Sequence, residues 1–232
     1  MKNVIWIFFF QFVLKFKVQY IPTPTIIDLD IDIPPIGVDM VMIKIKNEEL
    51  NLEETLETKN GGVVATKEKY AFGTKFTVEV TKVGWENLPN QVDTITVDAD
   101  EKKNDIVFSV KPKEFKLSFN VVGKADGVIP GAPIPGVKIQ MRISDGAPAI
   151  ETLETDASGK AETKKSYRFD WDKFEKVEVS KDGYILVEST PDLSKGITVG
   201  AEQKDNVISI VMSKPLVSIN TKSVLIKLLS FS

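Results

Sequence analysis

The chain has 232 residues, with 30 basic and 33 acidic side chains, a formal net charge of −3 and a hydrophobic fraction of 42%. This length allows one large domain or two of roughly 100 residues, and the charge balance excludes the basic surface of a nucleic-acid-binding protein. Because the chain has neither Cys nor His, disulfides, thiolate chemistry, His-ligated metals and histidine general bases are excluded, whereas carboxylate chemistry and oxygen-ligated Ca²⁺ are not.

The first 14 residues form an apolar N-terminal segment. After Met1 and Lys2, residues 4–14 read VIWIFFFQFVL, a run shorter than the about 20 residues that a membrane-spanning helix needs. Two interpretations stay open. A basic start followed by an apolar stretch is typical of a secretory signal, whereas the aromatic and β-branched content suits a buried first strand. The sequence therefore predicts no spanning helix here.

The next segment, TIIDLDIDIPP (25–35), alternates acidic and aliphatic residues. In an extended strand, Asp28, Asp30 and Asp32 would lie on one face, about 6.6 Å apart. Three carboxylates at that spacing could contribute to a Ca²⁺ site if a loop supplied carbonyl groups. The alternative is a solvated strand face that discourages edge-to-edge pairing.

Five blocks of sequence recur in one order, which indicates an internal duplication. FKVQY (16–20) matches FKLSF (115–119), PPIGVDMVMIKI (34–45) matches PIPGVKIQMRIS (133–144), and ETLET occurs at 54–58 and again at 151–155. VEVTKVGW (78–85) then matches VEVSKDGY (177–184), and KNDIVFSV (103–110) matches KDNVISIV (204–211). Length differences between the copies fall in polar segments, as expected for loops.

Each copy alternates apolar and polar residues in short segments separated by turn signals. The sequence therefore predicts an all-β protein with two tandem antiparallel β-sandwich domains, residues 15–112 and 113–215, and a short C-terminal extension, residues 216–232. The stretch DWDKFEKVEV (170–179) looks helical at first but ends in alternation. We expect Trp171 and Phe169 in the core there. Asp170 and Asp172 beside an aromatic ring also suit a sugar site, although a catalytic role is disfavoured.

The second copy resembles a known family of modules. The pattern GVKIQMRISD…TLETDASGKAE…KVEVSKDGYI is similar to the Ig-like, prealbumin-like β-sandwich repeats of bacterial surface proteins, the collagen-adhesin B-type and carboxypeptidase-regulatory-like modules. The positions that match the family pattern are Thr155, Asp156, Gly159, Val177, Val179, Lys181, Gly183 and Tyr184. The resemblance implies stalks, spacers and binding appendages. Some members crosslink a buried Lys to an Asn of the last strand, a pattern from which this chain departs.

Two more sets of residues are candidate sites. Asp98 and Asp100 lie in the acidic turn DADEKKND (98–105), which could bind Ca²⁺, but the EF-hand order is missing and the two lysines would repel a cation, so a polar turn is the alternative. Trp85 and Tyr184 follow a glycine at matched positions. Either aromatic ring could stack on a ligand or pack at the end of its sandwich.

The tail begins like a third copy, because LVSIN (216–220) corresponds to KLSFN (116–120). A single strand can neither bury its apolar face nor pair its backbone alone. We therefore expect residues 216–232 to dock on the second domain, or to add to the sheet edge of a neighbouring molecule and cause self-association.

These observations predict a non-enzymatic structural or adhesive repeat protein, extracellular or displayed on a cell surface. Its partner would be a protein or a glycan, with no nucleic acid and with no cofactor apart from the Ca²⁺ considered above. Two alternatives stay open. The chain could be a structural component of a virion or appendage, or a carbohydrate- or Ca²⁺-binding appendage of an enzyme system.

Overall fold

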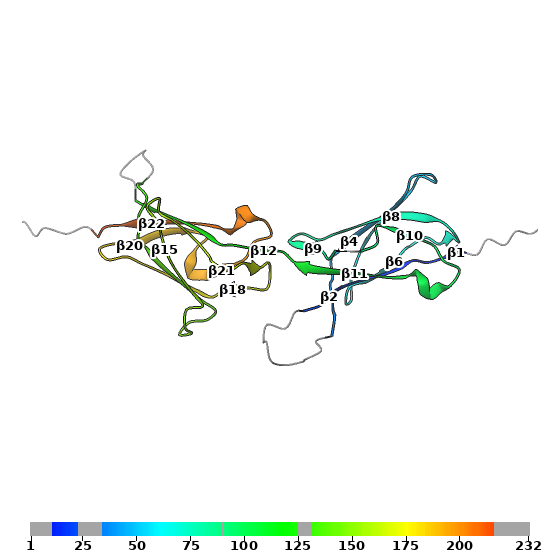
Figure 1. Cartoon of the computed structure of the whole chain (residues 1–232), viewed down its shortest axis with the longest axis horizontal. Coiled ribbons are helices and arrows are strands. Elements are labelled where there is room, and N and C mark those ends of the chain that lie inside the picture. Colours follow the sequence, from blue (N-terminus) through cyan, green and yellow to red (C-terminus); the bar gives the residue numbers. More distant parts are fainter. Residues whose placement is uncertain (1–10, 23–33, 90, 125–130, 216–232) are drawn as a thin grey trace, which may run out of the picture. The chain divides into compact units, whose positions relative to one another are not determined.

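The computed structural model describes residues 11–22, 34–89, 91–124 and 131–215 (Figure 1). Most of the N-terminal segment, the predicted strand with Asp28, Asp30 and Asp32, and the extension 216–232 lie outside the described residues. The chain divides into two compact units, residues 1–113 and 114–232. Among the described residues, secondary structure is β-strand with three short 3-10 helices, and no helix is long and apolar enough to cross a membrane.

In the described residues, unit 1 contains two large sheets that share one apolar core, and a short pair of strands, β1 with β7. One sheet has the order β10-β8-β4-β5, and the other has the order β3-β2-β11-β9, with β6 also paired to β2. The elements of this unit are β1 (Gln11–Phe12), β2 (Lys15–Tyr20), β3 (Ile36–Gly37), β4 (Met42–Asn47), β5 (Leu52–Glu57), β6 (Val63–Ala65), β7 (Tyr70–Ala71), β8 (Lys75–Thr81), β9 (Trp85–Asn87), β10 (Thr94–Thr96), η1 (Glu101–Asn104) and β11 (Asp105–Pro112).

Unit 2 repeats this plan, with one sheet in the order β16-β13-β22-β20 and the other in the order β15-β14-β19. Two further short strand pairs, β12 with β17 and β18 with β21, belong to this unit. Its elements are β12 (Glu114–Phe115), β13 (Ser118–Gly123), β14 (Lys138–Arg142), β15 (Glu151–Glu154), β16 (Lys160–Glu162), β17 (Tyr167–Arg168), β18 (Lys173–Phe174), β19 (Lys176–Ser180), β20 (Ile185–Thr190), η2 (Leu193–Lys195), β21 (Ile197–Thr198), η3 (Gln203–Asn206) and β22 (Val207–Ser213).

The alternation of the sequence places the core of each unit. In β2, with the sequence KFKVQY, Phe16, Val18 and Tyr20 are buried while the two lysines face solvent. In β13, Phe119 and Val121 are fully buried in the same way. Because successive strand residues point to opposite faces, every second residue of these strands faces the core, and these residues are the apolar ones. These strands confirm the predicted all-β sandwich.

Among the strands that the structure describes, one pair in each unit is parallel rather than antiparallel. In unit 1, β2 runs parallel to the last strand β11, with Phe16 opposite Ile106. In unit 2, β13 runs parallel to the last strand β22, with Phe119 opposite Ile208. The chain thus enters and leaves the paired region of each unit at opposite ends of two adjacent strands.

The two ETLET segments take the same place in their units. In unit 1, Ile43 of β4 lies opposite Leu56 on one side and Val80 on the other. In unit 2, Ile139 of β14 lies in the same way opposite Leu153 and Val179. The matched leucines and valines therefore occupy equivalent strands around an equivalent isoleucine.

Three of the predicted block matches are wrong in register, and one of them is the match of the last strands, where Ile106 corresponds to Ile208, an offset of 102 rather than 101. Phe16 corresponds to Phe119, because both lie opposite the last strand, whereas Phe115 pairs with Tyr167 as Phe12 pairs with Tyr70. The predicted and observed offsets, 99 and 103, differ by an even number, and such a slip preserves the inside–outside alternation. The match of the second long strands is wrong by an odd number of residues, because Ile43 corresponds to Ile139, an offset of 96 rather than 99. The segment between β2 and β4 is longer than the segment between β13 and β14.

Candidate functional site

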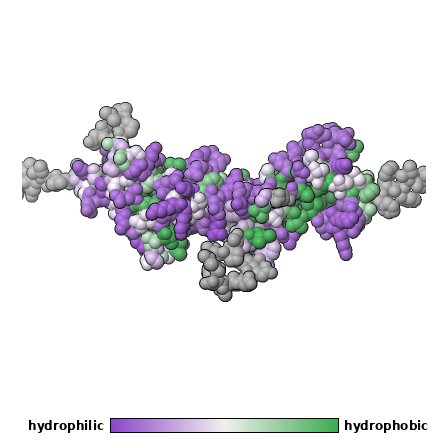
Figure 2. Space-filling model, viewed as in Figure 1, coloured by the Kyte–Doolittle hydropathy of each residue, from purple (hydrophilic) through white to green (hydrophobic). Residues whose placement is uncertain are grey.

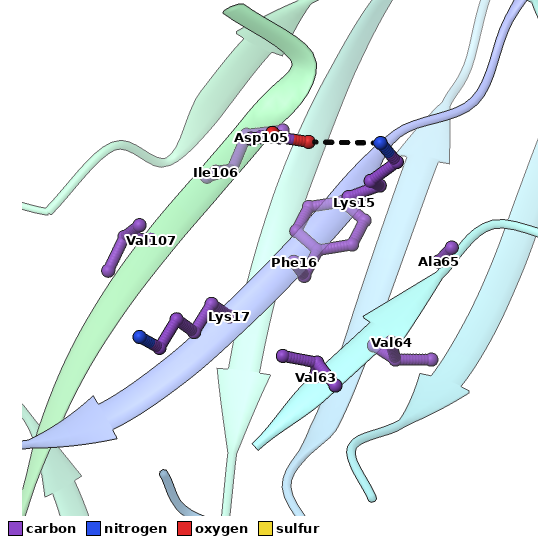
Figure 3. A pocket seen from close by; sticks show the side chains of 9 residues that line it. All are labelled: Lys15, Phe16, Lys17, Val63, Val64, Ala65, Asp105, Ile106 and Val107. Atoms are coloured by element: carbon purple, nitrogen blue, oxygen red, sulfur yellow. Dashed lines mark ion pairs between the residues drawn. The ribbon is translucent and has the colours of Figure 1, made fainter. Parts of the chain in front are cut away.

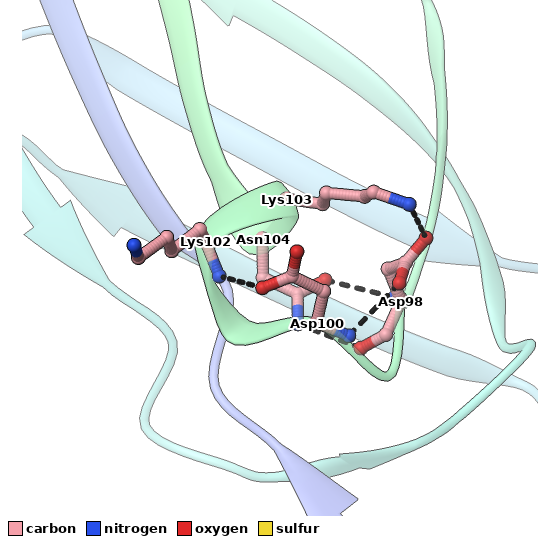
Figure 4. A network of polar contacts seen from close by, with 5 residues as sticks. All are labelled: Asp98, Asp100, Lys102, Lys103 and Asn104. Carbon is pink, nitrogen blue, oxygen red and sulfur yellow. Dashed lines mark hydrogen bonds and ion pairs between the residues drawn. The ribbon is translucent and has the colours of Figure 1, made fainter.

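The acidic turn of unit 1 is closed by its own hydrogen bonds (Figure 4). The Asp98 carboxylate accepts from the Asp100 N–H at 2.9 Å and lies 3.4 Å from the Lys103 ammonium. Asp100 caps η1 by accepting from the Lys102 N–H at 3.1 Å. The hydrogen bond from the backbone N–H of Asp100 is the main cause that lowers the pKa of Asp98, and the ammonium of Lys103 lowers it further. These two carboxylates therefore brace the turn.

The same turn in unit 2 keeps the buried asparagine but has Gly200 in the place of Asp98. In unit 1 the buried Asn104 accepts from the Asp98 N–H and donates to the Asp98 carbonyl, both at 2.9 Å. In unit 2 the buried Asn206 makes the matching contacts with Gly200, at 2.7 and 3.2 Å. Across the described residues, no group of three or more acidic side chains is placed to hold a metal ion. Ca²⁺ binding by Asp98 and Asp100, or by Asp28, Asp30 and Asp32, stays a prediction.

Trp85 and Tyr184 occupy matched places at the edges of their cores. Trp85 is half-buried, packs against the core of unit 1, and meets Tyr20 edge to face with the ring centroids 5.9 Å apart. Tyr184 packs against the core of unit 2. The ammonium groups of Lys82 and Lys214 each lie 5.9 Å from the ring of Trp85 and Tyr184, respectively. The two rings contribute to packing, and ligand stacking on them stays a prediction.

The expectation that Trp171 lies in the core is wrong. Trp171 is 42% exposed, and the Arg168 guanidinium lies over its ring, 5.3 Å from the centroid. Asp170 has a positive φ of 61°, so the chain turns here and the strand alternation is broken. The Asp172 carboxylate accepts from the Arg168 N–H at 2.6 Å. The buried aromatic residue is instead Phe174, in β18.

A matched carboxylate–tyrosine pair in each unit was not found from the sequence. In unit 1 the Tyr70 hydroxyl donates to the Glu54 carboxylate at 2.8 Å, and the same carboxylate accepts from the Lys67 N–H. In unit 2 the Tyr167 hydroxyl and the Lys164 N–H donate to Glu151, which is buried. The sequence does contain a signal for these pairs, because the first Glu of each ETLET motif is followed by a Tyr at the same distance along the chain.

The pKa values of Tyr70 and Tyr167 are raised far above the ordinary value of about 10. Burial is the main cause, and the hydrogen bond of each phenol to Glu54 or Glu151 is the second. The folded state therefore holds protons that the unfolded chain releases above about pH 10. This contribution to stability is complete below that pH and is lost as the pH rises towards the raised pKa values.

We expect the free energy of unfolding to fall between pH 9 and pH 11, as measured by urea titration at each pH. The matched control is the variant with Tyr70→Phe and Tyr167→Phe, which lacks both phenols and should show a shallower decline. An equal decline in both proteins would contradict a role for the tyrosines, because Lys deprotonation would then explain the whole effect.

A shallow apolar groove of about 450 Å³ lies on the outer face of the β6-β2-β11 sheet in unit 1 (Figure 3). Val63 and Val107 flank Lys17 on the two neighbouring strands, and Lys15 forms an ion pair with Asp105 at 3.7 Å. Figure 2 shows hydrophobic surface over unit 1. In unit 2 the positions equivalent to Val63 and Val107 carry Lys160 and Ser209, so this groove is a feature of one unit.

No model of a known protein family matches the chain, and no curated protein matches it. Among solved structures, the Bacillus anthracis TIE protein is 16% identical with a TM-score of 0.48, covering 87% of this chain and 34% of that chain. The chain therefore spans about a third of the TIE chain.

Two pilins are further structures to which the chain is similar. The minor pilin GBS52 of Streptococcus agalactiae is 16% identical with a TM-score of 0.30, covering 88% of this chain and 97% of that one. The shaft pilin SpaA of Lactobacillus rhamnosus GG is 12% identical with a TM-score of 0.32, covering 90% of this chain and 99% of that one. The assignment to a tandem all-β sandwich rests on the strand pairing of the chain itself.

Proposed function

We propose that the chain is a non-enzymatic structural or adhesive β-sandwich repeat protein, extracellular or displayed on a cell surface. The observation that carries the proposal is the parallel pairing of the first long strand of each unit with its last strand. The registers run from Lys15 opposite Asp105 in unit 1 and from Ser118 opposite Val207 in unit 2.

This pairing suits a chain that carries load. A pull on the start of β13 and the end of β22 acts along both strands, while the hydrogen bonds between them lie across the pull. All the bonds of the ladder must then yield together. If the strands were instead pulled apart at one shared end, the bonds would break one after another at a lower force.

The polar groups that the two units share also suit a structural role. Thr58 and Thr155 each accept from a backbone N–H and donate to a backbone carbonyl in the loop before the second long strand. Thr66 and Thr163 each accept from the backbone N–H at the entrance of the first long strand. With the matched asparagines and carboxylate–tyrosine pairs, these groups hold loops in place. The duplicated positions therefore support the scaffold.

A partner would meet surface that differs between the units. The outer groove of unit 1, with Val63 and Val107 beside Lys17, suits an apolar protein segment better than a sugar ring, which stacks on aromatic faces. A virion or appendage component would use the same parallel strands, and a carbohydrate- or Ca²⁺-binding appendage would use the candidate residues above. Self-association through residues 216–232 is a further arrangement that builds larger structures.

The test is single-molecule unfolding of unit 2 by two pulling geometries. Because the chain has no Cys, handles can be attached at introduced cysteines. We expect the pair Ser118→Cys and Ser213→Cys, which loads β13 and β22 along their length, to unfold at a several-fold higher force than the pair Ser118→Cys and Val207→Cys. The second pair is the matched control, because it separates the same two strands from one end. Equal forces would contradict a load-bearing role.

A further inference from the structure

Three successive apolar side chains are exposed at an edge of unit 2. β20 is the last strand of its sheet, beside β22. Ile185 is 52% exposed, Leu186 is 44% exposed and Val187 is 43% exposed. Soluble proteins usually protect such an edge with charged residues or a short strand, so three successive exposed apolar side chains are unusual at this position.

Unit 1 provides an internal comparison, because its edge strand β9 begins at Trp85, the residue that matches Tyr184 immediately before β20. Glu86 and Asn87 stand in unit 1 where Ile185 and Leu186 stand in unit 2. Glu86 forms an ion pair with Lys111 at 3.0 Å, and Asn87 donates to the Val80 carbonyl at 3.0 Å. The apolar edge is therefore specific to unit 2 and is not a requirement of the fold.

The chain leaves the described part of unit 2 beside this apolar edge. Ser213, at the end of β22, lies opposite Ile185, at the start of β20. The next residue, Lys214, places its ammonium 5.9 Å from the ring of Tyr184, immediately before β20. The described part of the chain therefore ends close to the start of the apolar edge.

The sequence of residues 216–232 fits an apolar surface. Residues 224–229 read VLIKLL, and the whole segment contains Lys222 and Lys227 but no acidic residue. β20 contributes Glu188, an acidic residue next to Val187. The two surfaces thus combine apolar complementarity with opposite charge.

We propose that residues 216–232 dock on the apolar edge formed by Ile185, Leu186 and Val187 of the same chain. Removing apolar surface from water on both sides drives the contact, and the direct connection through Pro215 gives the segment a high effective concentration. The register shift between Leu186 and Glu188 interrupts the regular ladder of β20. The segment therefore covers the edge by side-chain packing rather than by a continuous added strand.

The test measures how fast a thiol reagent labels the single cysteine of the Leu186→Cys variant. We expect the reaction to speed up about tenfold when Leu225→Lys and Leu228→Lys are added to the full chain, because charged side chains would release the segment and open the site. The matched control is Asn87→Cys, at the equivalent position of unit 1, whose labelling rate should not respond to the tail substitutions. Truncation after Pro215 should reproduce the faster labelling of Leu186→Cys.

Two outcomes would overturn the proposal. One is an equal labelling rate at Leu186→Cys with the native and the substituted tail, which would mean that the edge is uncovered. The other is protection that increases with protein concentration, because a neighbouring chain would then be the occupant. Neither outcome depends on the force measurement, so this inference and the proposed function fail independently.

Discussion

Replacing Phe119 by alanine is expected to destabilise unit 2 by about 3–5 kcal/mol, the usual cost of removing a buried phenylalanine. The Phe119 side chain is fully buried in β13, between Ala161 of β16 and Ile208 of β22. Its removal leaves a cavity at the centre of the sheet that contains the parallel strand pair. Calorimetric melting should show a large downward shift in the transition of unit 2.

The matched variant is Phe16→Ala, because Phe16 takes the same place in unit 1 and is 1% exposed. We expect it to shift the transition of unit 1 and to leave that of unit 2 in place. If either substitution moved both transitions equally, the two units would unfold as one, and the separate cores would not be independent sources of stability.

Replacing Thr155 by valine should destabilise unit 2 by about 2–4 kcal/mol, because two buried backbone groups lose their partner. The buried Thr155 hydroxyl accepts from the Val137 N–H at 2.9 Å and donates to the Ile134 carbonyl at 2.8 Å. Valine has nearly the same shape but can do neither. Urea unfolding would measure the loss as a lower midpoint.

Two controls separate the hydroxyl from the methyl group and one unit from the other. Thr155→Ser keeps the hydroxyl and should recover most of the stability. Thr58→Val removes the equivalent brace of unit 1, where the hydroxyl contacts Val41 and Val38, and should destabilise that unit similarly. A Thr155→Val protein as stable as the parent would show that neither backbone group depends on this hydroxyl.

The sequence indicates which turns of the two units match, but it does not indicate which contacts their side chains make. The matched turns are visible in the sequence because polar residues recur before each last strand, and the structure shows that the buried asparagine of each turn makes the same backbone contacts. The carboxylate–tyrosine pairs were not anticipated because Glu54 and Tyr70 are distant in the chain and meet only when β5 and β7 are placed. The position of Trp171 depended on a single left-handed residue, Asp170.

Local sequence patterns are enough to establish the class of the fold and its duplication. Alternation with a period of two decides which residues face the core, and the ETLET and VEV blocks identify equivalent strands that pair around Ile43 and Ile139. Tertiary structure alone decided the register of the first strands, since a slip by four residues leaves the alternation unchanged. It also decided the parallel pairing of first and last strands, because that contact joins the two ends of a unit and no local pattern encodes its direction.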